Sequence, residues 1–426
     1  MHSGQLVSFT GLIAMVVLTW LLSSHRKLFP WKMVRNGILL QFALAMAILW
    51  TPPGEILFEL IGAFFNRVLS FVNDGSGFLF NINARSDDPV LPPRFILLRS
   101  FAFGVLPTII FFSSFMAILY HLGVMQWIVS LMAAIMQRTM GTSGAESLAA
   151  AANVFVGHTE APLVVKPYIA SMTRSELKAL MVGGFATISG GLLAAYAGMG
   201  IDAAHLLTAS VISAPAALVV AKILQPEQER PATMGEVKLD IKRDTVNVLD
   251  AAAKGATDGL KLALNVGAVL IAFLALIAMA DAALGGIGSL FGFDGQPGHP
   301  EWSLTALLGF LFSPIAWLMG IEWNDCRASG QLLGLKMFAN EFVAYDQLGK
   351  WLNPDSDVQL QPRSVLIMTY ALSGFANFGA IGIQIGGIGG LAPERRSGLA
   401  RLGLRAMLGG AIACCMTACI AGMLIP

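Results

Sequence analysis

Charged residues are scarce in this chain of 426 residues. Asp, Glu, Lys and Arg together make up 12% of it, while 56% is hydrophobic and the mean hydropathy is +0.70. A soluble globular domain typically carries roughly 25% charged residues. Length alone would allow two or three soluble domains, but a composition this apolar excludes them. We therefore interpret the chain as a polytopic membrane protein.

The sequence also lacks the motifs on which membrane enzymes depend. It contains no HExxH and no GxSxG, and its six histidines are scattered, which disfavours an intramembrane hydrolase. Its four cysteines form no CxxC pair and match no disulfide or metal framework. Three of them lie in the last apolar segment, where we expect small apolar packing. The four are Cys326, Cys414, Cys415 and Cys419.

Apolar segments of spanning length recur along the chain. A helix needs about 20 residues to cross the hydrocarbon core of a bilayer. Two further stretches, 123–139 and 302–321, are expected at the cytoplasmic and the outer interface. The predicted spans lie near 5–23, 36–53, 99–121, 176–199, 205–224, 258–280, 363–388 and 402–425.

Basic residues gather in alternate connections. They follow the first span and the fifth span, and they precede the last one, whereas the other connections carry mainly Asp and Glu. Basic loops stay on the cytoplasmic side of a membrane. Eight spans satisfy this rule in every loop, and both termini are then expected to face outward, into the periplasm of a bacterial cell.

Two apolar stretches, 145–170 and 328–350, are interrupted in the middle by polar residues. We interpret each as a re-entrant hairpin, because irregular backbone at membrane depth is tolerated only where it lines a cavity. Each is followed by a Gly-Phe-Ala block that ends in a polar residue, Thr187 or Asn377. The charge rule orients the two copies oppositely, and inverted repeats with broken helices are typical of secondary transporters.

These patterns predict an all-α polytopic fold with an inverted repeat. It has eight transmembrane helices, two re-entrant helical hairpins and interfacial helices. We expect scaffold helices and a cytoplasmic interfacial helix in 1–144, and the first hairpin with its transport helices in 145–224. A cytoplasmic loop, a scaffold helix and an outer interfacial helix occupy 225–327, and the second hairpin with its transport helices occupies 328–426.

Several long motifs resemble one family over nearly the whole chain. They include "ANVFVGHTEAPLVVKPYIASMTRSELKALMVGGFATISGG", "NEFVAY" and "SGFANFGAIGIQIGGIGGLAPERRS". These closely resemble the concentrative nucleoside transporters, in the shorter bacterial form. The resemblance implies a homotrimer in the bacterial inner membrane that takes up nucleosides with a sodium gradient by an elevator-type movement. In each protomer a mobile domain would hold one nucleoside and one coupling ion beside a scaffold.

The resemblance also implies roles for particular residues. The first hairpin offers four residues to the nucleobase, against which a leucine packs: Gly157, His158, Thr159, Glu160 and Leu192. The second half offers a carboxylate and an amide to the ribose and a phenylalanine as an apolar wall: Glu341, Asn377 and Phe375. The implied sodium ligands are two side chains, of Asn153 and Thr187, and two carbonyls, of Val156 and Ile188. Amide, hydroxyl and unwound carbonyl oxygens suit a hard cation.

The sequence departs from the family pattern at two pocket positions. His158 stands where the family usually has glutamine, and Ala380 where it often has serine. A neutral histidine also donates and accepts, but from different ring atoms and with a different reach. Ala380 removes a hydroxyl directed at the ribose. The preferred nucleoside is therefore left open.

Each of these residues also has a structural interpretation. An intramembrane carboxylate costs about 2.5–3.5 kcal/mol at a helix centre on insertion scales, so Glu160 and Glu341 are expected to be functional, although Lys336 could pair with Glu341. His158 and Phe375 could be ordinary core residues, and Asn153 could cap a half-helix. Among functions, proton coupling through His158 or a glutamate is the alternative to sodium, and a passive channel is disfavoured by the two polar hairpins.

Overall fold

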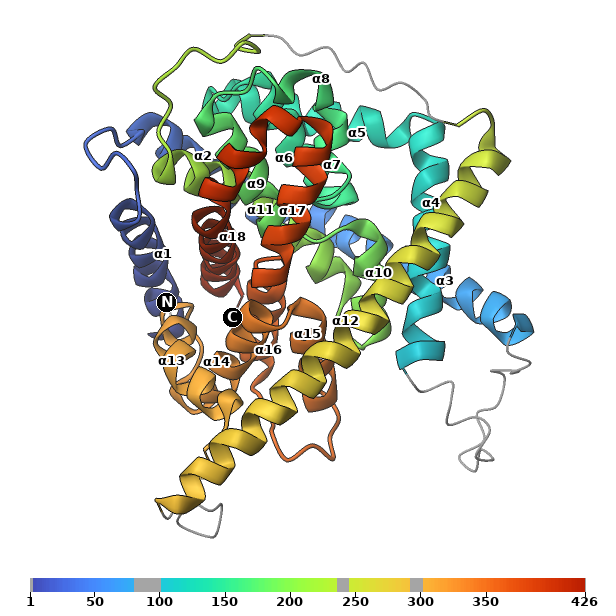
Figure 1. Ribbon diagram of the computed structural model, residues 1–426, viewed down its shortest axis with the longest axis vertical. Coiled ribbons are helices and arrows are strands. Elements are labelled where there is room, and N and C mark those ends of the chain that lie inside the picture. Colours follow the sequence, from blue (N-terminus) through green and yellow to red (C-terminus); the bar gives the residue numbers. More distant parts are fainter. Residues whose placement is uncertain (1–2, 80–100, 236–244, 292–301, 426) are drawn as a thin grey trace.

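The structure is a computed structural model that describes residues 3–79, 101–235, 245–291 and 302–425. Within those ranges every regular element is a helix (Figure 1). The first half contains α1 (Ser3–Leu21), α2 (Trp31–Leu49), α3 (Pro52–Leu79), the π-helical turn η2 (Phe101–Val105), α4 (Leu106–His121), α5 (Val124–Met140), α6 (Gly144–Val156), α7 (Ala161–Val164), α8 (Lys166–Ile169), α9 (Arg174–Ala186), α10 (Gly190–Gly198) and α11 (Ala203–Leu224). The second half contains α12 (Val248–Leu290), α13 (Leu304–Leu318), α14 (Trp323–Phe338), α15 (Glu341–Trp351), α16 (Pro362–Leu372), α17 (Phe378–Leu391), the 3-10 turn η3 (Pro393–Arg395) and α18 (Arg396–Leu424).

Seven helical segments in the described part of the chain are long and apolar enough to cross a membrane. The number is eight if α13 and α14, which are bent by 117° against each other, are taken as one span. Seven of the spans expected from the sequence coincide with these segments, and α5 coincides with the expected interfacial helix. The remaining span, 363–388, is divided into α16 and α17, neither of which is long enough to cross alone.

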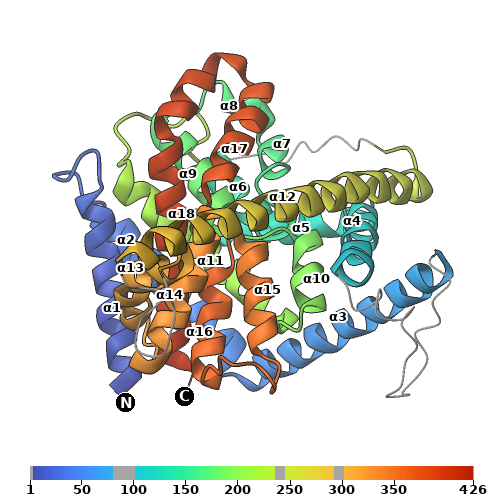
Figure 2. The ribbon, with the colours of Figure 1, turned by 60° about the horizontal axis from the view of Figure 1, so that its bottom comes forward.

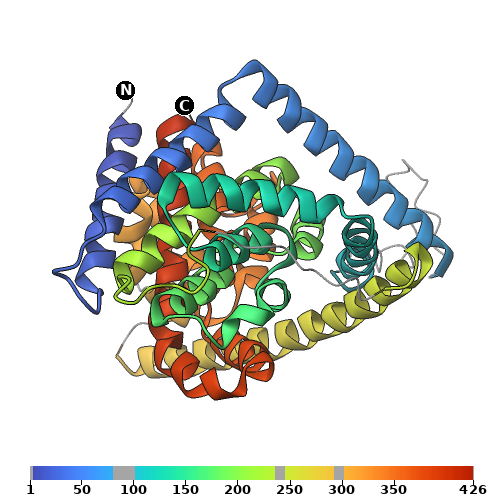
Figure 3. The ribbon, with the colours of Figure 1, turned by 90° about the horizontal axis from the view of Figure 1, so that it is seen from above.

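The long helix α3 has no counterpart among the elements expected from the sequence. It extends from Pro52 to Leu79 and lies along one edge of the molecule (Figure 3). Glu59, Arg67 and Asp74 interrupt the apolar residues of this segment. The sequence interpretation assigns no helix to this segment, although its apolar residues recur with the periodicity of an amphipathic helix.

The longest helix, α12, crosses one side of the molecule and packs against α4 (Figure 2). Two glycines four residues apart make this approach possible. A Cβ at Gly255 would lie 2.6 Å from the carbonyl oxygen of Ser113, and a Cβ at Gly259 would lie 2.8 Å from Cα of Ile110. Small residues at this spacing let two helix backbones come into contact in a membrane.

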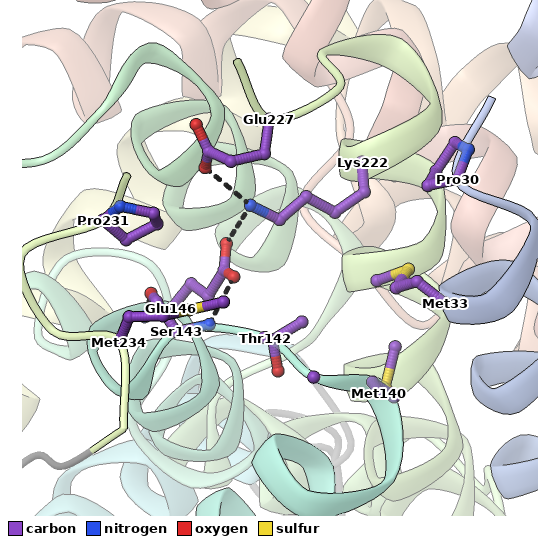
Figure 4. A pocket seen from close by; sticks show the side chains of 11 residues that line it. Pro30, Met33, Met140, Thr142, Ser143, Glu146, Lys222, Glu227, Pro231 and Met234 are labelled. Atoms are coloured by element: carbon purple, nitrogen blue, oxygen red, sulfur yellow. Dashed lines mark hydrogen bonds and ion pairs between the residues drawn. The ribbon is translucent and has the colours of Figure 1, made fainter. Parts of the chain in front are cut away.

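Charged groups buried near the start of α6 connect that helix to α9 and α11. The Lys222 ammonium lies 2.7 Å from Glu146 and 3.2 Å from Glu227 (Figure 4). The Ser143 hydroxyl donates to Glu176 at 2.6 Å. Ser143 also caps α6 through a reciprocal bond with Glu146. This cluster borders a cavity of about 150 Å³. Breaking one member of a buried pair leaves an uncompensated charge, so the cluster fixes the three helices relative to one another.

Four helix ends meet in the interior, because two helix pairs are broken there. The segment 187–189 separates α9 from α10, and 373–377 separates α16 from α17. Cys414 of α18 lies between the breaks, with its sulfur 3.5 Å from the carbonyl oxygen of Ala186 and 3.6 Å from that of Ser373. Cys414 is therefore packed in the last helix, as expected. Its S–H group is in addition a weak donor to carbonyls that lack a partner at the helix ends.

Candidate functional site

The chain turns at residues 157–160, between α6 and α7, within the segment expected to form the first hairpin. Gly157 has φ +80°, and a Cβ there would lie 2.6 Å from Cβ of Ser189, so both the backbone conformation and the close approach to the α9–α10 break require glycine. The turn therefore places His158, Thr159 and Glu160 beside the break.

His158 connects the two halves of the molecule. Its ring meets the ring of Phe375 edge to face, with centroids 4.5 Å apart, a favourable geometry for aromatic pairs. Both ring nitrogens are shielded from solvent and make no hydrogen bond within the described residues. His158 is therefore in contact with the second half, but its polar atoms are unsatisfied.

The other two polar residues of this turn are more open. Thr159 and Glu160 are exposed in the isolated protomer. Glu160 is close enough to Asp258 of α12 for the two carboxylates to repel each other. Leu192, the expected apolar neighbour of the nucleobase, is buried in α10. The turn thus presents a hydroxyl and a carboxylate at the surface that faces α12.

Glu341 begins α15 and is 2% exposed. Each of its carboxylate oxygens has a donor: the Tyr196 hydroxyl lies 3.1 Å from one, and the Asn377 amide nitrogen lies 3.3 Å from the other. Asn377 in turn accepts from the backbone N–H of Ala380 at 2.8 Å and so caps α17. Residues from α10, α15 and α17 therefore form one hydrogen-bonded cluster in the apolar interior.

The alternative pairing of Glu341 with Lys336 is absent from the ion pairs of the described residues. The Lys336 ammonium instead donates to the carbonyl oxygen of Ala371 at 2.8 Å, and the Tyr345 hydroxyl donates to that of Thr369 at 2.8 Å. Both carbonyls belong to the last turn of α16, which has no helical partner of its own for them. Lys336 thus stabilises a helix end.

The expected sodium ligands lie where α6 passes the end of α9. Asn153 is 1% exposed, and neither atom of its amide has a hydrogen-bond partner among the described residues. A Cβ at Gly183 would lie 3.1 Å from the Asn153 amide nitrogen, and the Thr187 hydroxyl donates to the Gly183 carbonyl at 3.0 Å. The N-cap of α6 is Ser143, so Asn153 is not a capping residue.

Two backbone carbonyls complete the expected ligand set. Val156 is the last residue of α6, and Ile188 follows Thr187 in the break before α10. Carbonyls at helix ends lack the next helical N–H and remain available to an ion. A buried amide without a partner is costly, so the unsatisfied Asn153 amide, the Thr187 hydroxyl and these carbonyls fit a small hard cation.

Two polar residues near these groups were not singled out from the sequence. Tyr196 occurs alone in the apolar run "LLAAYAG" and Gln384 alone in "GIQIGG". A single tyrosine in a span usually contributes packing area, and nothing near it in the sequence indicates a carboxylate partner. Gln384 is 1% exposed and donates to the Met181 carbonyl of α9 at 3.2 Å; a buried glutamine in a glycine-rich helix was the available signal.

The helices and their interior polar groups define a class of protein. It is an all-helical membrane protein whose broken helices enclose polar side chains, as solute carriers have. Three family models match the chain: the amino terminus of Na+-dependent nucleoside transporters over residues 10–82, a nucleoside recognition domain over 102–203, and the carboxyl terminus of Na+-dependent nucleoside transporters over 205–422.

The proteins that are similar to this chain in sequence are also transporters. An uncharacterised transporter of Haemophilus influenzae is 43% identical, with 99% of this chain and 98% of that protein covered. Human solute carrier family 28 member 3 is 42% identical over 99% of the chain, which spans 60% of that protein's length. Rat sodium/nucleoside cotransporter 1 is 42% identical over 99% of the chain, which spans 64% of that protein. The chain thus corresponds to about three fifths of the length of these animal proteins.

Solved structures of CNTnw have the same fold. The inward-facing, substrate-bound state aligns with a TM-score of 0.89 at 42% identity, covering 98% of this chain and 97% of that one. A doubly substituted variant in an outward-facing state aligns with a TM-score of 0.89 at 40% identity, covering 99% and 98%. The chain therefore belongs to the family of sodium-dependent, concentrative nucleoside transporters. Its relatives are transporters, and sodium is the coupling ion of the family.

Proposed function

We propose that this chain takes up nucleosides into a bacterial cell across the inner membrane as a sodium symporter. The observation that supports this most directly is the Glu341 cluster. A carboxylate accepts hydrogen bonds only, and its two oxygens match the two adjacent hydroxyls, O2′ and O3′, of a ribose. In the present structure the Tyr196 and Asn377 donors hold that carboxylate in place in the interior, where an unpaired charge would be costly.

The remaining site residues take the roles expected from the family resemblance. Glu341, Asn377 and the position of Ala380 face the ribose, and Phe375 forms an apolar wall. The nucleobase is met by the first hairpin and α10, through Gly157, His158, Thr159, Glu160 and Leu192. Sodium is held by the Asn153 and Thr187 side chains and the carbonyls of Val156 and Ile188. The unsatisfied polar atoms of Asn153 and His158 support this division.

The movement we propose is an elevator in a homotrimer. Segments 145–224 and 328–426, with the two hairpins, form the mobile unit, and segments 1–144 and 225–327 form the scaffold. A connection between the two segments supports one mobile unit: Arg395 donates to the carbonyls of Ala170 and Met172 across the halves. Both termini then face the periplasm.

Uptake into proteoliposomes tests the proposal. Radiolabelled uridine and adenosine are offered with a sodium gradient alone, a proton gradient alone, or neither. We expect accumulation above the equilibrium level with sodium alone. Accumulation driven only by the proton gradient would show that the coupling ion is the proton and not sodium. Equilibration without accumulation would indicate a channel. Absence of saturable uptake for every nucleoside would contradict the nucleoside assignment itself.

A further inference from the structure

Gln384 lies on α17, two turns after Asn377, and its side chain is buried. Its amide nitrogen donates to the Met181 carbonyl of α9 at 3.2 Å, while its amide oxygen has no partner among the described residues. The Met181 bond also establishes which end of the amide is which, because a carbonyl oxygen can accept only from the nitrogen. Gln384 therefore has one free acceptor, in a fixed orientation.

Gly184 brings this amide next to His158. A Cβ on Gly184 would lie 2.7 Å from the Gln384 amide nitrogen and also 2.7 Å from Cβ of His158. The two side chains thus share the space that the glycine leaves open on α9. Any larger residue at position 184 would displace both.

Three buried polar atoms without hydrogen-bond partners in the described part of the chain therefore come from two neighbouring side chains: the Gln384 amide oxygen and both ring nitrogens of His158. Buried polar groups in native proteins are nearly always hydrogen-bonded, and an exception needs an explanation. A neutral imidazole has one N–H donor and one acceptor nitrogen. The unpaired acceptor of Gln384 is complementary to that donor.

We propose that Gln384 is a positioning residue for His158. Its amide oxygen accepts the ring N–H of His158, directly or across one water molecule, when a nucleoside is bound. This bond selects one neutral tautomer and leaves the other ring nitrogen as an acceptor. His158 then recognises a nucleobase edge that carries an N–H donor, such as N3–H of uracil or the N6 amino group of adenine.

The inference rests on the proposed function and adds a specificity mechanism to it. The side chain at position 158 does not act alone: its hydrogen-bonding character is set by a residue from the opposite half of the chain. A second interpretation is that Gln384 only holds α17 against α9 through Met181. The two interpretations differ in whether removing the amide changes which nucleobases bind or weakens all nucleosides equally.

A double-mutant cycle distinguishes them. Inhibition constants are measured in sodium-containing proteoliposomes for uridine and adenosine and for two analogues without the edge donor, 3-methyluridine and purine riboside. The proteins are wild type, Gln384→Met, His158→Ala and the double variant. Methionine keeps the length of glutamine without its polar atoms.

We expect the wild type to prefer each parent over its analogue by about tenfold or more, the scale of one good hydrogen bond to a buried partner. Gln384→Met should reduce that preference several-fold, and His158→Ala should remove most of it. In the His158→Ala background, Gln384→Met should have no further effect on the preference. The ratio of uridine to 2′,3′-dideoxyuridine affinity should stay unchanged in Gln384→Met, because Glu341 and Asn377 are intact.

Other results would overturn the inference. If Gln384→Met weakens parents and analogues alike, or if its effect adds fully to that of His158→Ala, Gln384 only supports the helices. Failure of the proposed function is seen separately, in the wild type: that protein would either bind no nucleoside or bind uridine and 2′,3′-dideoxyuridine equally well. Histidine ¹⁵N spectra of the wild type, with His158 assigned by its loss in His158→Gln, need no Gln384 variant: one neutral tautomer is expected with uridine bound, and an equal mixture or a charged ring would contradict the proposal.

Discussion

The two halves of the molecule contain similar breaks but satisfy their polar groups differently. In the second half, both oxygens of Glu341 already have donors, and Asn377 is fixed by capping α17. In the first half, the Asn153 amide and the His158 ring nitrogens have no hydrogen-bond partner among the described residues, and Thr159 and Glu160 are exposed. The second half is thus preorganised, whereas the first half has polar groups that a bound species would satisfy.

This difference bears on what each half is proposed to bind. The ribose is common to all nucleosides, so a rigid carboxylate prepared for its hydroxyls serves every substrate, and preorganisation reduces the entropy lost on binding. The proposed cation and nucleobase would satisfy the polar groups of the first half only on binding. Unpaired buried groups raise the free energy of the empty site, which favours occupancy by an ion and a substrate together.

The largest effect is expected from Glu341, whose removal breaks the preorganised half. Glu341→Ala should abolish measurable uptake, because charge-assisted hydrogen bonds are worth about 1.5–3 kcal/mol each and two are lost. Nucleoside binding should weaken by about a hundredfold or more. Equilibrium binding of labelled uridine to purified protein measures this directly.

The matched control is Glu229→Ala, since Glu229 is exposed and lies outside the cluster. Thermal unfolding of both variants reports whether the protein still folds. If folded Glu341→Ala protein bound uridine with nearly wild-type affinity, Glu341 would not bind the ribose. In the wild type, 2′,3′-dideoxyuridine should compete far less well than uridine.

The next largest effect is expected from Asn153, the unsatisfied amide of the first half. Asn153→Ala removes an oxygen that the backbone of the break cannot replace. The sodium concentration for half-maximal uptake should rise by about tenfold or more, which corresponds to about 1.4 kcal/mol or more, or sodium dependence should be lost. Sodium titration of uridine uptake at fixed membrane potential measures it.

Asn353→Ala, in the exposed connection after α15, is the control for an asparagine change. Sodium-driven uptake with an unchanged midpoint in the Asn153→Ala protein would show that this amide does not hold the ion. The comparison of the two halves would then rest on His158 alone.

Much of the fold could be predicted from the sequence, because spans depend on a local property. Runs such as 205–224 are apolar enough to identify helix by helix, and the basic loops order them. The polar interruptions within 145–170 and 328–350 coincide with helix ends, between α6 and α7 and between α14 and α15. By contrast, the 28-residue helix α3 was missed, because its apolar residues alternate with polar and charged ones in an amphipathic pattern that a search for apolar runs does not use.

The partners of the site residues could not be predicted in the same way. Tyr196 and Glu341 are 145 positions apart, and Gln384 and Met181 are 203 apart. Contacts of this kind depend on how four helix ends meet, which hydropathy does not record. Lys336 illustrates the limit: five residues before Glu341 it looks like an ion-pair partner, yet its ammonium donates to the Ala371 carbonyl at the end of α16.

A smaller effect is expected from Tyr196, which contributes one of the two donors to Glu341. Tyr196→Phe keeps the ring but leaves one carboxylate oxygen without its hydroxyl donor. Uridine affinity should fall by about five- to tenfold, the usual range for one hydrogen bond. The loss should be smaller for 2′,3′-dideoxyuridine, because that ligand makes little use of Glu341.

Tyr345→Phe provides the matched control. Its ring lies 4.5 Å from that of Tyr196, but its hydroxyl donates to the Thr369 carbonyl and not to Glu341. That variant should lower stability without changing the ratio of uridine to dideoxyuridine affinity. Equal ratios in Tyr196→Phe and Tyr345→Phe would show that the Tyr196 hydroxyl does not orient the carboxylate.

The smallest effect is expected from Ala380, and it has the opposite sign. Ala380 is buried in the first turn of α17, and its N–H donates to the Asn377 side chain. Ala380→Ser adds the hydroxyl that the family often has at this position, so it extends the preorganised half by one ribose-directed group. Uridine affinity should rise by about two- to tenfold, because one neutral hydrogen bond contributes about 0.5–1.5 kcal/mol. Ala380→Cys, which is similar in size but a weak donor, should give little gain. A gain for uridine that is equally large for 2′,3′-dideoxyuridine would place the new hydroxyl away from the sugar. A loss in affinity would mean that the added oxygen competes with Ala380 N–H for Asn377, and the rigidity of that cluster would then depend on the absence of the hydroxyl.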